Sequence, residues 1–280
     1  MTKNYLSICA DDFGITSNVN LAILNLVKIK SLTEVSCITL TKNFEFDAIK
    51  LKEYKNDISV GLHLTLTDFK PLSGNKFLIK KNKMFSAKDL FSKCVFNKIP
   101  DIYFLEEINL QIEKFKNILG FYPDFIDGHQ HIHQFPVIRR CLIKILKEKK
   151  LHDKIWIRNS SENISSILVR KVSILKCLIL SMFGNSFKNK LIKENIKTND
   201  GFSGIYDFSE KKDYTTLFKK FIIKNSNNHL IMVHPGFSDQ ILSDLDSVTK
   251  TRDLEYEFFS SNFFFDILRR NNITLKKLFS

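Results

Sequence analysis

Acidic and histidine side chains stand at the ends of four short apolar runs in this chain. In chain order, they are Asp11 and Asp12, His63, Asp127 with His129, and His234. Carboxylates and imidazoles bind divalent metals and transfer protons. Four such junctions, spread over most of the length, are typical of parallel strands that deliver side chains to the C-terminal mouth of an α/β barrel. The pattern favours an enzyme.

The first junction carries two adjacent acids. On an extended strand end, Asp11 and Asp12 point to different sides, and neighbouring carboxylates repel unless a cation or a proton neutralises them. Gly14 follows in a turn where glycine can take a positive φ. One Asp could instead cap the helix that begins near Thr16 or Asn18, but that explains only one of the two acids.

Histidines dominate the next two junctions. His63 alone is more often a hydrogen-bonded core residue, but an acid and a second imidazole beside it would make a three-ligand metal site with open positions. His129, His131 and His133 alternate, so an extended stretch would project all three from one face. Because Pro136 follows, we expect one to bind metal and another to contact substrate or orient a neighbour. A histidine tract that binds nothing is the alternative.

The last junction places His234 before Pro235 and Gly236. Proline restricts the histidine to extended geometry, and glycine lets the backbone turn sharply beside the site. His234 is therefore placed to donate a proton, as an imidazolium at rest that protonates a leaving amine. A structural histidine that bonds a loop carbonyl is the alternative.

Together these motifs resemble the YdjC-like carbohydrate deacetylases, which include chitooligosaccharide deacetylase and share their logic with NodB-type polysaccharide deacetylases. The resemblance covers the chain from about Tyr5 to the stretch that ends at Glu255. It implies a distorted (β/α) barrel, commonly of seven strands. The motifs that carry it are Ala10–Gly14, Gly61–Leu64, Asp127–His133 with Phe135–Pro136, and His234–Gly236.

The resemblance also implies a site and a reaction. One divalent metal would be held by Asp12, His63 and His129, with Asp11 as the general base. Magnesium is the ion usually attached to this family, whereas two imidazoles suit zinc or manganese better. The metal would polarise an N-acetyl carbonyl and a water, Asp11 would take a proton from that water, and His234 would protonate the departing sugar amine as acetate leaves.

Four further residues are candidates for substrate contact: His133, Arg158, Phe13 and Arg252. Arg158 ends a predicted strand and could hold sugar hydroxyls or orient Asp11. The same roles suit Arg252 with Glu255, although surface ion pairing explains those two equally well. Phe13 could stack on a sugar face, but core filling fits at least as well.

The elements that must position these residues alternate as βα units would. Strands are predicted over Tyr5–Ala10, Val35–Leu40, Ile58–Leu64, Phe125–Ile126, Ile155–Ile157 and Leu230–Val233. Helices are predicted over 18–29, over 105–119 with Gly120 as the stop, from Pro136 onward, over 164–183 and around 217–222. We expect one α/β barrel domain over residues 1–280, with the irregular segment 68–100 as a candidate lid.

Composition narrows the class of partner and the cellular compartment. The 280 residues are 44% hydrophobic, enough for a packed core, and the net charge is +13. Because the lysines are scattered rather than gathered in a stripe, we expect no nucleic-acid partner. The five cysteines show no CxxC spacing and indicate reduced thiols. A first strand that begins almost at once argues against a signal peptide, which predicts a cytoplasmic protein.

Several alternatives stay open. The chain could be a metal hydrolase of another bond, such as a glycosidic linkage, or a basic non-catalytic protein that binds nucleic acid or anionic lipid. The apolar stretch 174–183 is too short for a bilayer and contains Lys176, so no membrane span is expected. The composition of the whole Lys-flanked helical stretch 164–183 is nevertheless compatible with a lipid-linked or membrane-proximal substrate. The sugar is not specified, and a homodimer is compatible with the sequence.

Overall fold

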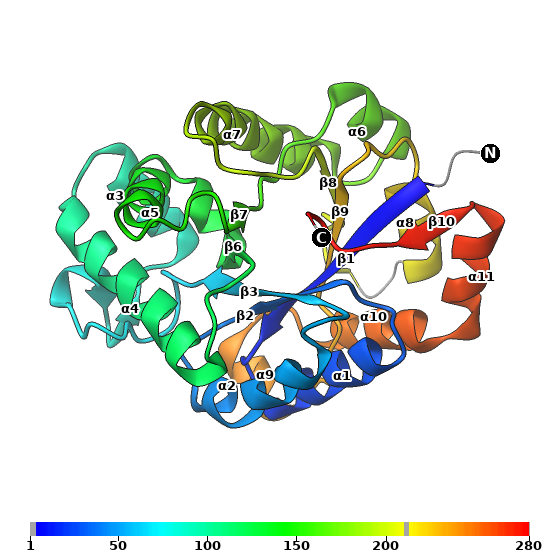
Figure 1. Cartoon of the computed structure of the whole chain (residues 1–280), viewed down its shortest axis with the longest axis horizontal. Coiled ribbons are helices and arrows are strands. Elements are labelled where there is room, and N and C mark those ends of the chain that lie inside the picture. The colour runs from blue at the N-terminus through cyan, green and yellow to red at the C-terminus, as the bar shows by residue number, and fades with distance from the viewer. Residues whose placement is uncertain (1–3, 210–212, 280) are drawn as a thin grey trace.

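The computed structural model describes residues 4–209 and 213–279. Seven parallel strands form a curled sheet in the spatial order β7-β6-β3-β2-β1-β9-β8 (Figure 1). This arrangement confirms the predicted seven-stranded (β/α) barrel. The strands are β1 (Asn4–Phe13), β2 (Glu34–Cys37), β3 (Ser59–Leu64), β6 (Phe125–Gly128), β7 (Trp156–Ile157), β8 (Gly201–Ser203) and β9 (His229–Val233).

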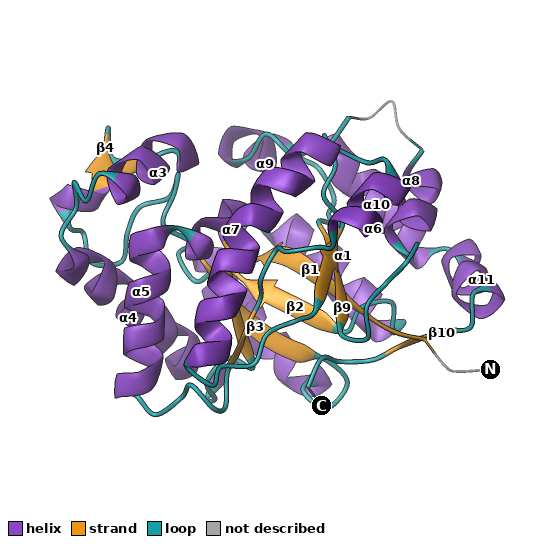
Figure 2. Ribbon diagram, turned by 90° about the horizontal axis from the view of Figure 1, so that it is seen from above, coloured by secondary structure: helices purple, strands orange, loops and turns teal. Residues whose placement is uncertain are grey.

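Helices surround this sheet (Figure 2). They are α1 (Ser17–Lys28), α2 (Lys42–Asp47), α3 (Ala87–Val95), α4 (Asp101–Leu119), α5 (Pro136–Glu148), α6 (Ile164–Arg170), α7 (Ile174–Lys193), α8 (Tyr214–Phe221), α9 (Gln240–Leu245), α10 (Lys250–Ser260) and α11 (Asn262–Arg270). Short 3-10 helices are η1 (Ala48–Tyr54), η2 (Lys76–Leu78) and η3 (His129–Gln134). Strand β10 (Ile273–Leu275) pairs with the start of β1, and β4 (Ile79–Lys80) pairs with β5 (Lys83–Met84).

The two faces of β1 enter different parts of the core. Ile8 and Ala10 belong to the large hydrophobic cluster between sheet and helices. Cys9 belongs to a smaller cluster that includes Trp156 and Leu278. Because side chains alternate along a strand, a residue two positions after Cys9 continues the face of that smaller cluster.

The edge strands β7 and β8 are linked through loops. The N–H of Ile157 donates to the carbonyl of Lys197 at 2.9 Å. Asn159 and Asn199 each donate a side-chain amide to the other's carbonyl, at 2.7 and 2.9 Å. These contacts draw the two edges of the curled sheet together.

Some element boundaries differ from the sequence predictions. The stop of α4 at Gly120, with φ 82°, and the start of α5 at Pro136 are confirmed. The single helix predicted over 164–183 is wrong, because Lys171 and Ser173 take positive φ and separate α6 from α7. The short strands β8 and β10 were not predicted, since runs of three residues carry little periodicity.

Segment 68–100 folds beside η3, and the ring of its Phe69 packs edge-on against His129. Its Asp68 accepts a hydrogen bond from the side chain of Gln130 at 3.1 Å, and Phe91 contacts the rings of Phe135 and Phe183 edge-on. Helix α7 lies across the sheet (Figure 2). A lid role for this segment stays a prediction. Among the described residues, no helix is both long enough and apolar enough to span a membrane.

Candidate active site

A cavity of about 570 Å³ opens at the C-terminal ends of the strands, where all four sequence junctions meet. Its polar floor holds Asp11, Asp12, His63, His129 and His234. Its apolar lining is formed largely by Leu175, Ile179, Leu180, Ile205, Phe208 and Met232. A larger cavity of about 730 Å³ lies at the opposite end of β1, but none of the predicted site residues lines it. The candidate catalytic and metal-binding residues therefore place the site in the smaller cavity.

A bulge at the end of β1 sends the two adjacent carboxylates in different directions. Ala10 and Phe13 pair with residues of β2 that are only two positions apart, so β1 holds one extra residue between them. Asp12 has φ 67°, which is uncommon for a residue with a side chain. Asp11 continues the interior face of Cys9, while the bulge turns Asp12 toward the rim.

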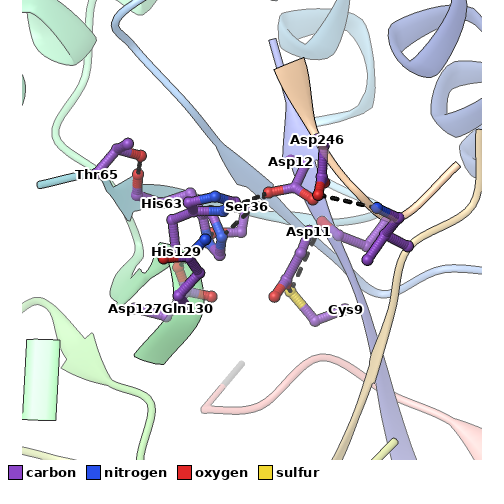
Figure 3. A network of polar contacts seen from close by, with 12 residues as sticks. Cys9, Asp11, Asp12, Ser36, His63, Thr65, Asp127, His129, Gln130 and Asp246 are labelled. Carbon is purple, nitrogen blue, oxygen red and sulfur yellow. Dashed lines mark hydrogen bonds and ion pairs between the residues drawn. The ribbon is translucent and has the colours of Figure 1, made fainter. Parts of the chain in front are cut away.

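Asp12, His63 and His129 meet at this rim (Figure 3). Oδ1 of Asp12 lies 3.3 Å from Nε2 of His63 and 3.1 Å from Nδ1 of His129. One donor atom from each residue lies within 4.8 Å of the others. Burial disfavours the charged form of Asp12, but Arg252 and the two imidazoles hold its pKa well below the usual range. One carboxylate and two imidazoles form a donor set that fits a divalent metal and leaves positions open.

Asp127, to which the sequence analysis assigned no role, orients His63. Its Oδ1 lies 2.7 Å from Nδ1 of His63 and accepts a hydrogen bond from Ser36 at 2.5 Å. We assign the imidazole proton to Nδ1 from this contact, which leaves Nε2 to face Asp12. Burial lowers the pKa of His63, but Asp127 and Asp11 outweigh burial and raise it to about 10. Without a metal the imidazole therefore also carries a proton on Nε2, which a bound metal ion would displace. The position of Asp127 at a strand end, two residues before His129, was the available signal.

Arg158 joins two carboxylates inside the barrel. Nη1 and Nη2 donate to the two carboxylate oxygens of Asp11 at 2.7 and 2.6 Å, and Nη2 lies 2.6 Å from Oδ2 of Asp127. All three side chains are buried. Burial disfavours the charged guanidinium, but the two carboxylates raise its pKa. Because Arg158 does not line the cavity, its position supports orienting Asp11 rather than holding sugar hydroxyls.

Arg252 and Glu255 are also fully buried, so the surface ion pairing considered for them is wrong. Nη2 of Arg252 donates to Oδ2 of Asp12 and to Oδ2 of Asp246, both at 2.6 Å. Glu255 accepts the backbone N–H of His234 at 2.5 Å. Helix α10 thus positions Asp12 and the backbone at His234. Arg252 does not line the cavity, and substrate contact by its side chain is not supported.

His234 lies on the cavity floor, directly after β9. Its Nδ1 is buried and has no hydrogen-bond partner in the described part of the chain, so a bond from that atom to a loop carbonyl is not supported. The ring packs edge-on against Phe208, with centroids 5.2 Å apart. Burial lowers the pKa of His234 to about 4, although Asp12 and Asp11 act in the opposite direction. The imidazole is therefore neutral near pH 7, and the expected resting imidazolium is not supported.

The histidines after β6 do not form the extended stretch considered in the sequence analysis. Gln130 and His131 have φ 55° and 60° within η3, so the side chains diverge. His131 lines the cavity, with Nδ1 3.1 Å from Oγ of Ser160. His133 is fully buried, and its Nε2 donates to the carbonyl of Arg158 at 2.9 Å. His133 thus supports the Arg158 backbone, and substrate contact by it is not supported.

The structure also distinguishes between the alternatives for Phe13 and for the cap of α1. Phe13 is buried in the core and does not line the cavity, so stacking on a sugar is not supported. Phe208 lines it instead, and nothing in its sequence context distinguished it among 26 phenylalanines. Thr16 caps α1 by accepting the N–H of Val19 at 3.2 Å, so neither Asp is the helix cap.

Comparisons with known proteins agree with this arrangement. A family model described as YdjC-like protein matches residues 5–270. A carbohydrate deacetylase of Thermoanaerobacter pseudethanolicus is 25% identical over 97% of this chain and 96% of its own. One of Clostridium beijerinckii is 27% identical over 95% of both chains. A chitooligosaccharide deacetylase of Proteus mirabilis is 30% identical over 52% of this chain and 56% of its own.

Among solved structures, a candidate cellobiose-phosphate cleavage protein of Enterococcus faecalis V583 is similar throughout. Its TM-score is 0.73 at 22% identity, and the match covers 99% of this chain and 98% of that one. At this identity the likeness shows the fold alone.

Proposed function

Because this chain belongs to the YdjC-like protein family, we propose that it is a metal-dependent hydrolase that removes the acetyl group from an N-acetylated sugar or oligosaccharide. Relatives named carbohydrate deacetylase and chitooligosaccharide deacetylase support this reaction. The observation that carries it is the trio of Asp12, His63 and His129 beside a separate carboxylate, Asp11, which Arg158 holds in place.

The donor set fits the proposed ion. Asp12 carries the negative charge, and His63 presents Nε2 because Asp127 engages its Nδ1. A divalent ion bound by Asp12, His63 and His129 would polarise the amide carbonyl and acidify a water molecule. Two imidazoles favour zinc or manganese on ligand softness, while magnesium is the ion usual for the family.

Asp11 acts as the general base in this proposal. The paired guanidinium of Arg158 holds this carboxylate in a fixed orientation, which a base needs before it accepts the proton of the attacking water. His234 protonates the sugar amine as the C–N bond breaks. Because burial keeps His234 neutral at rest, it must gain a proton during turnover. The proton that Asp11 takes from the attacking water supplies it, and the negative charge that develops on the substrate beside His234 favours that transfer.

Acetate release from a panel of N-acetylated glycans, with and without added divalent ions, tests the reaction. Asp11→Asn should reduce kcat while keeping the metal, whereas His129→Ala should lose the metal first. Equal metal loss in both variants would overturn the role assignment. New reducing ends without acetate would instead indicate glycosidic cleavage, and indifference to chelators would contradict a metal-dependent enzyme.

A further inference from the structure

Helix α7 is apolar on two opposite sides. Gly184, Phe187 and Leu191 are buried against the rest of the protein. Leu175, Ile179 and Met182, spaced i, i+4 and i+7, share another side of the helix and are 73%, 48% and 63% exposed. A helix that is apolar all round is expected to be covered on all sides. The structure leaves this outer stripe uncovered among the described residues.

The neighbouring helix also exposes apolar side chains. α6 packs against α7 and exposes Ile164, Leu168 and Val169, each by half or more. Exposed apolar residues that occur singly need no explanation, but a group on two adjacent helices marks an interaction site. We define these six side chains, three from each helix, as the α6–α7 surface.

The α6–α7 surface is continuous with the candidate active site. Leu175 and Ile179 belong to the outer stripe and also line the cavity. Further apolar lining comes from Leu180 and Phe208. A molecule on the α6–α7 surface would therefore meet the cavity entrance, and its apolar part could remain in contact with α7 while its polar part faces the metal trio.

The charged residues of the segment that forms this surface have a single sign. Residues 163–193 contain no Asp or Glu, and their charged residues are Arg170, Lys171, Lys176, Lys188, Lys190 and Lys193. Apolar side chains flanked by lysines are typical of helices that lie in the interface of an anionic membrane. A protein partner would not require acids to be missing from the whole segment. Since α7 also cannot span a bilayer, it would lie on the surface rather than cross it.

We propose that the α6–α7 surface docks on an anionic lipid bilayer and presents the cavity to N-acetylated sugars carried on lipids. The choice of substrate class rests on the proposed deacetylase function, whereas the docking itself does not. Apolar burial and lysine–headgroup attraction act together in this docking, so binding should depend both on anionic lipid and on salt.

Co-sedimentation with phosphatidylcholine vesicles, with and without phosphatidylglycerol, tests the docking. The triple variant Leu168→Ser, Val169→Ser, Met182→Ser changes no residue that lines the cavity. We expect the wild-type chain to bind the anionic vesicles, added salt to weaken binding, and the triple variant to bind about tenfold less or weaker. The matched control is Phe46→Ser with Ile49→Ser, which removes two exposed apolar side chains from α2 and η1, at the opposite side of Figure 1 from α7.

Three results would overturn the docking: no binding to anionic vesicles, equal binding by the triple variant, or equal loss in the control. A dimer in sedimentation velocity that the triple variant loses, without vesicle binding, would assign the surface to a second copy of the chain and also overturn it. The substrate class is tested by acetate release from an N-acetylglucosaminyl lipid in vesicles, compared with a short soluble N-acetylated sugar. The triple variant should lose only the first activity. Vesicle binding without any acetate release would leave the docking intact and refute the proposed function.

Discussion

Replacing Asp127 by Asn tests whether a carboxylate outside the metal trio controls metal binding. Asp127 accepts from Nδ1 of His63 and from Ser36, and its second oxygen lies 2.6 Å from Nη2 of Arg158. Asn keeps the size but removes the charge and one acceptor oxygen. His63 then loses the partner that fixes its orientation and increases its basicity as a ligand.

The size of the effect follows from these contacts. Loss of a carboxylate that orients a metal-binding histidine typically costs about 10–100-fold in metal affinity, or about 1.4–2.7 kcal/mol. Arg158 keeps its two bonds to Asp11, so the protein should still fold. The unfolding free energy should nevertheless fall, by less than the roughly 3–5 kcal/mol typical when a buried charge loses its only partner.

The assay is calorimetric titration of the metal-free chain with zinc or manganese. Asp124→Asn is the matched control, because Asp124 stands at the other end of the same strand, where it accepts the N–H of Val60 at 2.8 Å and pairs with Lys55. The control should bind metal as the wild type does. Asp127→Asn with affinity within about twofold of wild type would refute the orienting role, as would equal weakening in Asp124→Asn.

Three other predictions concern Arg158, Glu34 and the bound metal. Arg158→Lys keeps the charge but cannot grip both oxygens of Asp11, so kcat for acetate release should fall by about tenfold or more, and an unchanged kcat would contradict the positioning role. Burial raises the pKa of Glu34 from 4.5 to about 7. At pH values between these two, the folded chain binds more protons than the unfolded chain, so the free energy of unfolding falls as pH rises through that window. Glu34→Gln should therefore raise the denaturation midpoint at about pH 8 and leave it nearly unchanged at about pH 4, whereas an equal effect at both would refute the assignment. Metal at about a hundredfold excess over Kd should add about 2.7 kcal/mol to the free energy of unfolding and raise Tm by roughly 5–10 °C. A chelator should return Tm to its metal-free value and abolish the activity.

The candidate site was predictable where one strand end supplies one side chain. Asp12, His63 and His129 each end or follow a strand of a parallel sheet, and such ends gather at the same rim. Their meeting within 4.8 Å follows from that topology. Asp127 obeys the same rule, but its contact with His63 depends on how β3 and β6 pair, with His63 opposite Asp127. Strand order and register are not visible in any single motif.

The surroundings of the site were less predictable. Arginine is usually a surface residue, yet Arg158 and Arg252 are both buried. Carboxylates from distant segments pair with them: Asp11 and Asp127 with Arg158, and Asp12 with Arg252. The alternating histidines indicated an extended stretch, but the backbone turns into η3 after β6 and separates them. A local sequence pattern does not predict a turn that is caused by packing against other elements.

The strand ends, the residue types at them and the apolar periodicity can be read from the amino-acid sequence, since they depend on near neighbours along the chain. Three features are visible only in the folded protein: the bulge that turns Asp12 away from Asp11, the contact between Asp127 and His63, and the apolar side chains that α7 gives to the cavity. The physical reason is that each of these contacts joins segments far apart in sequence, and long-range burial and pairing then outweigh local preference.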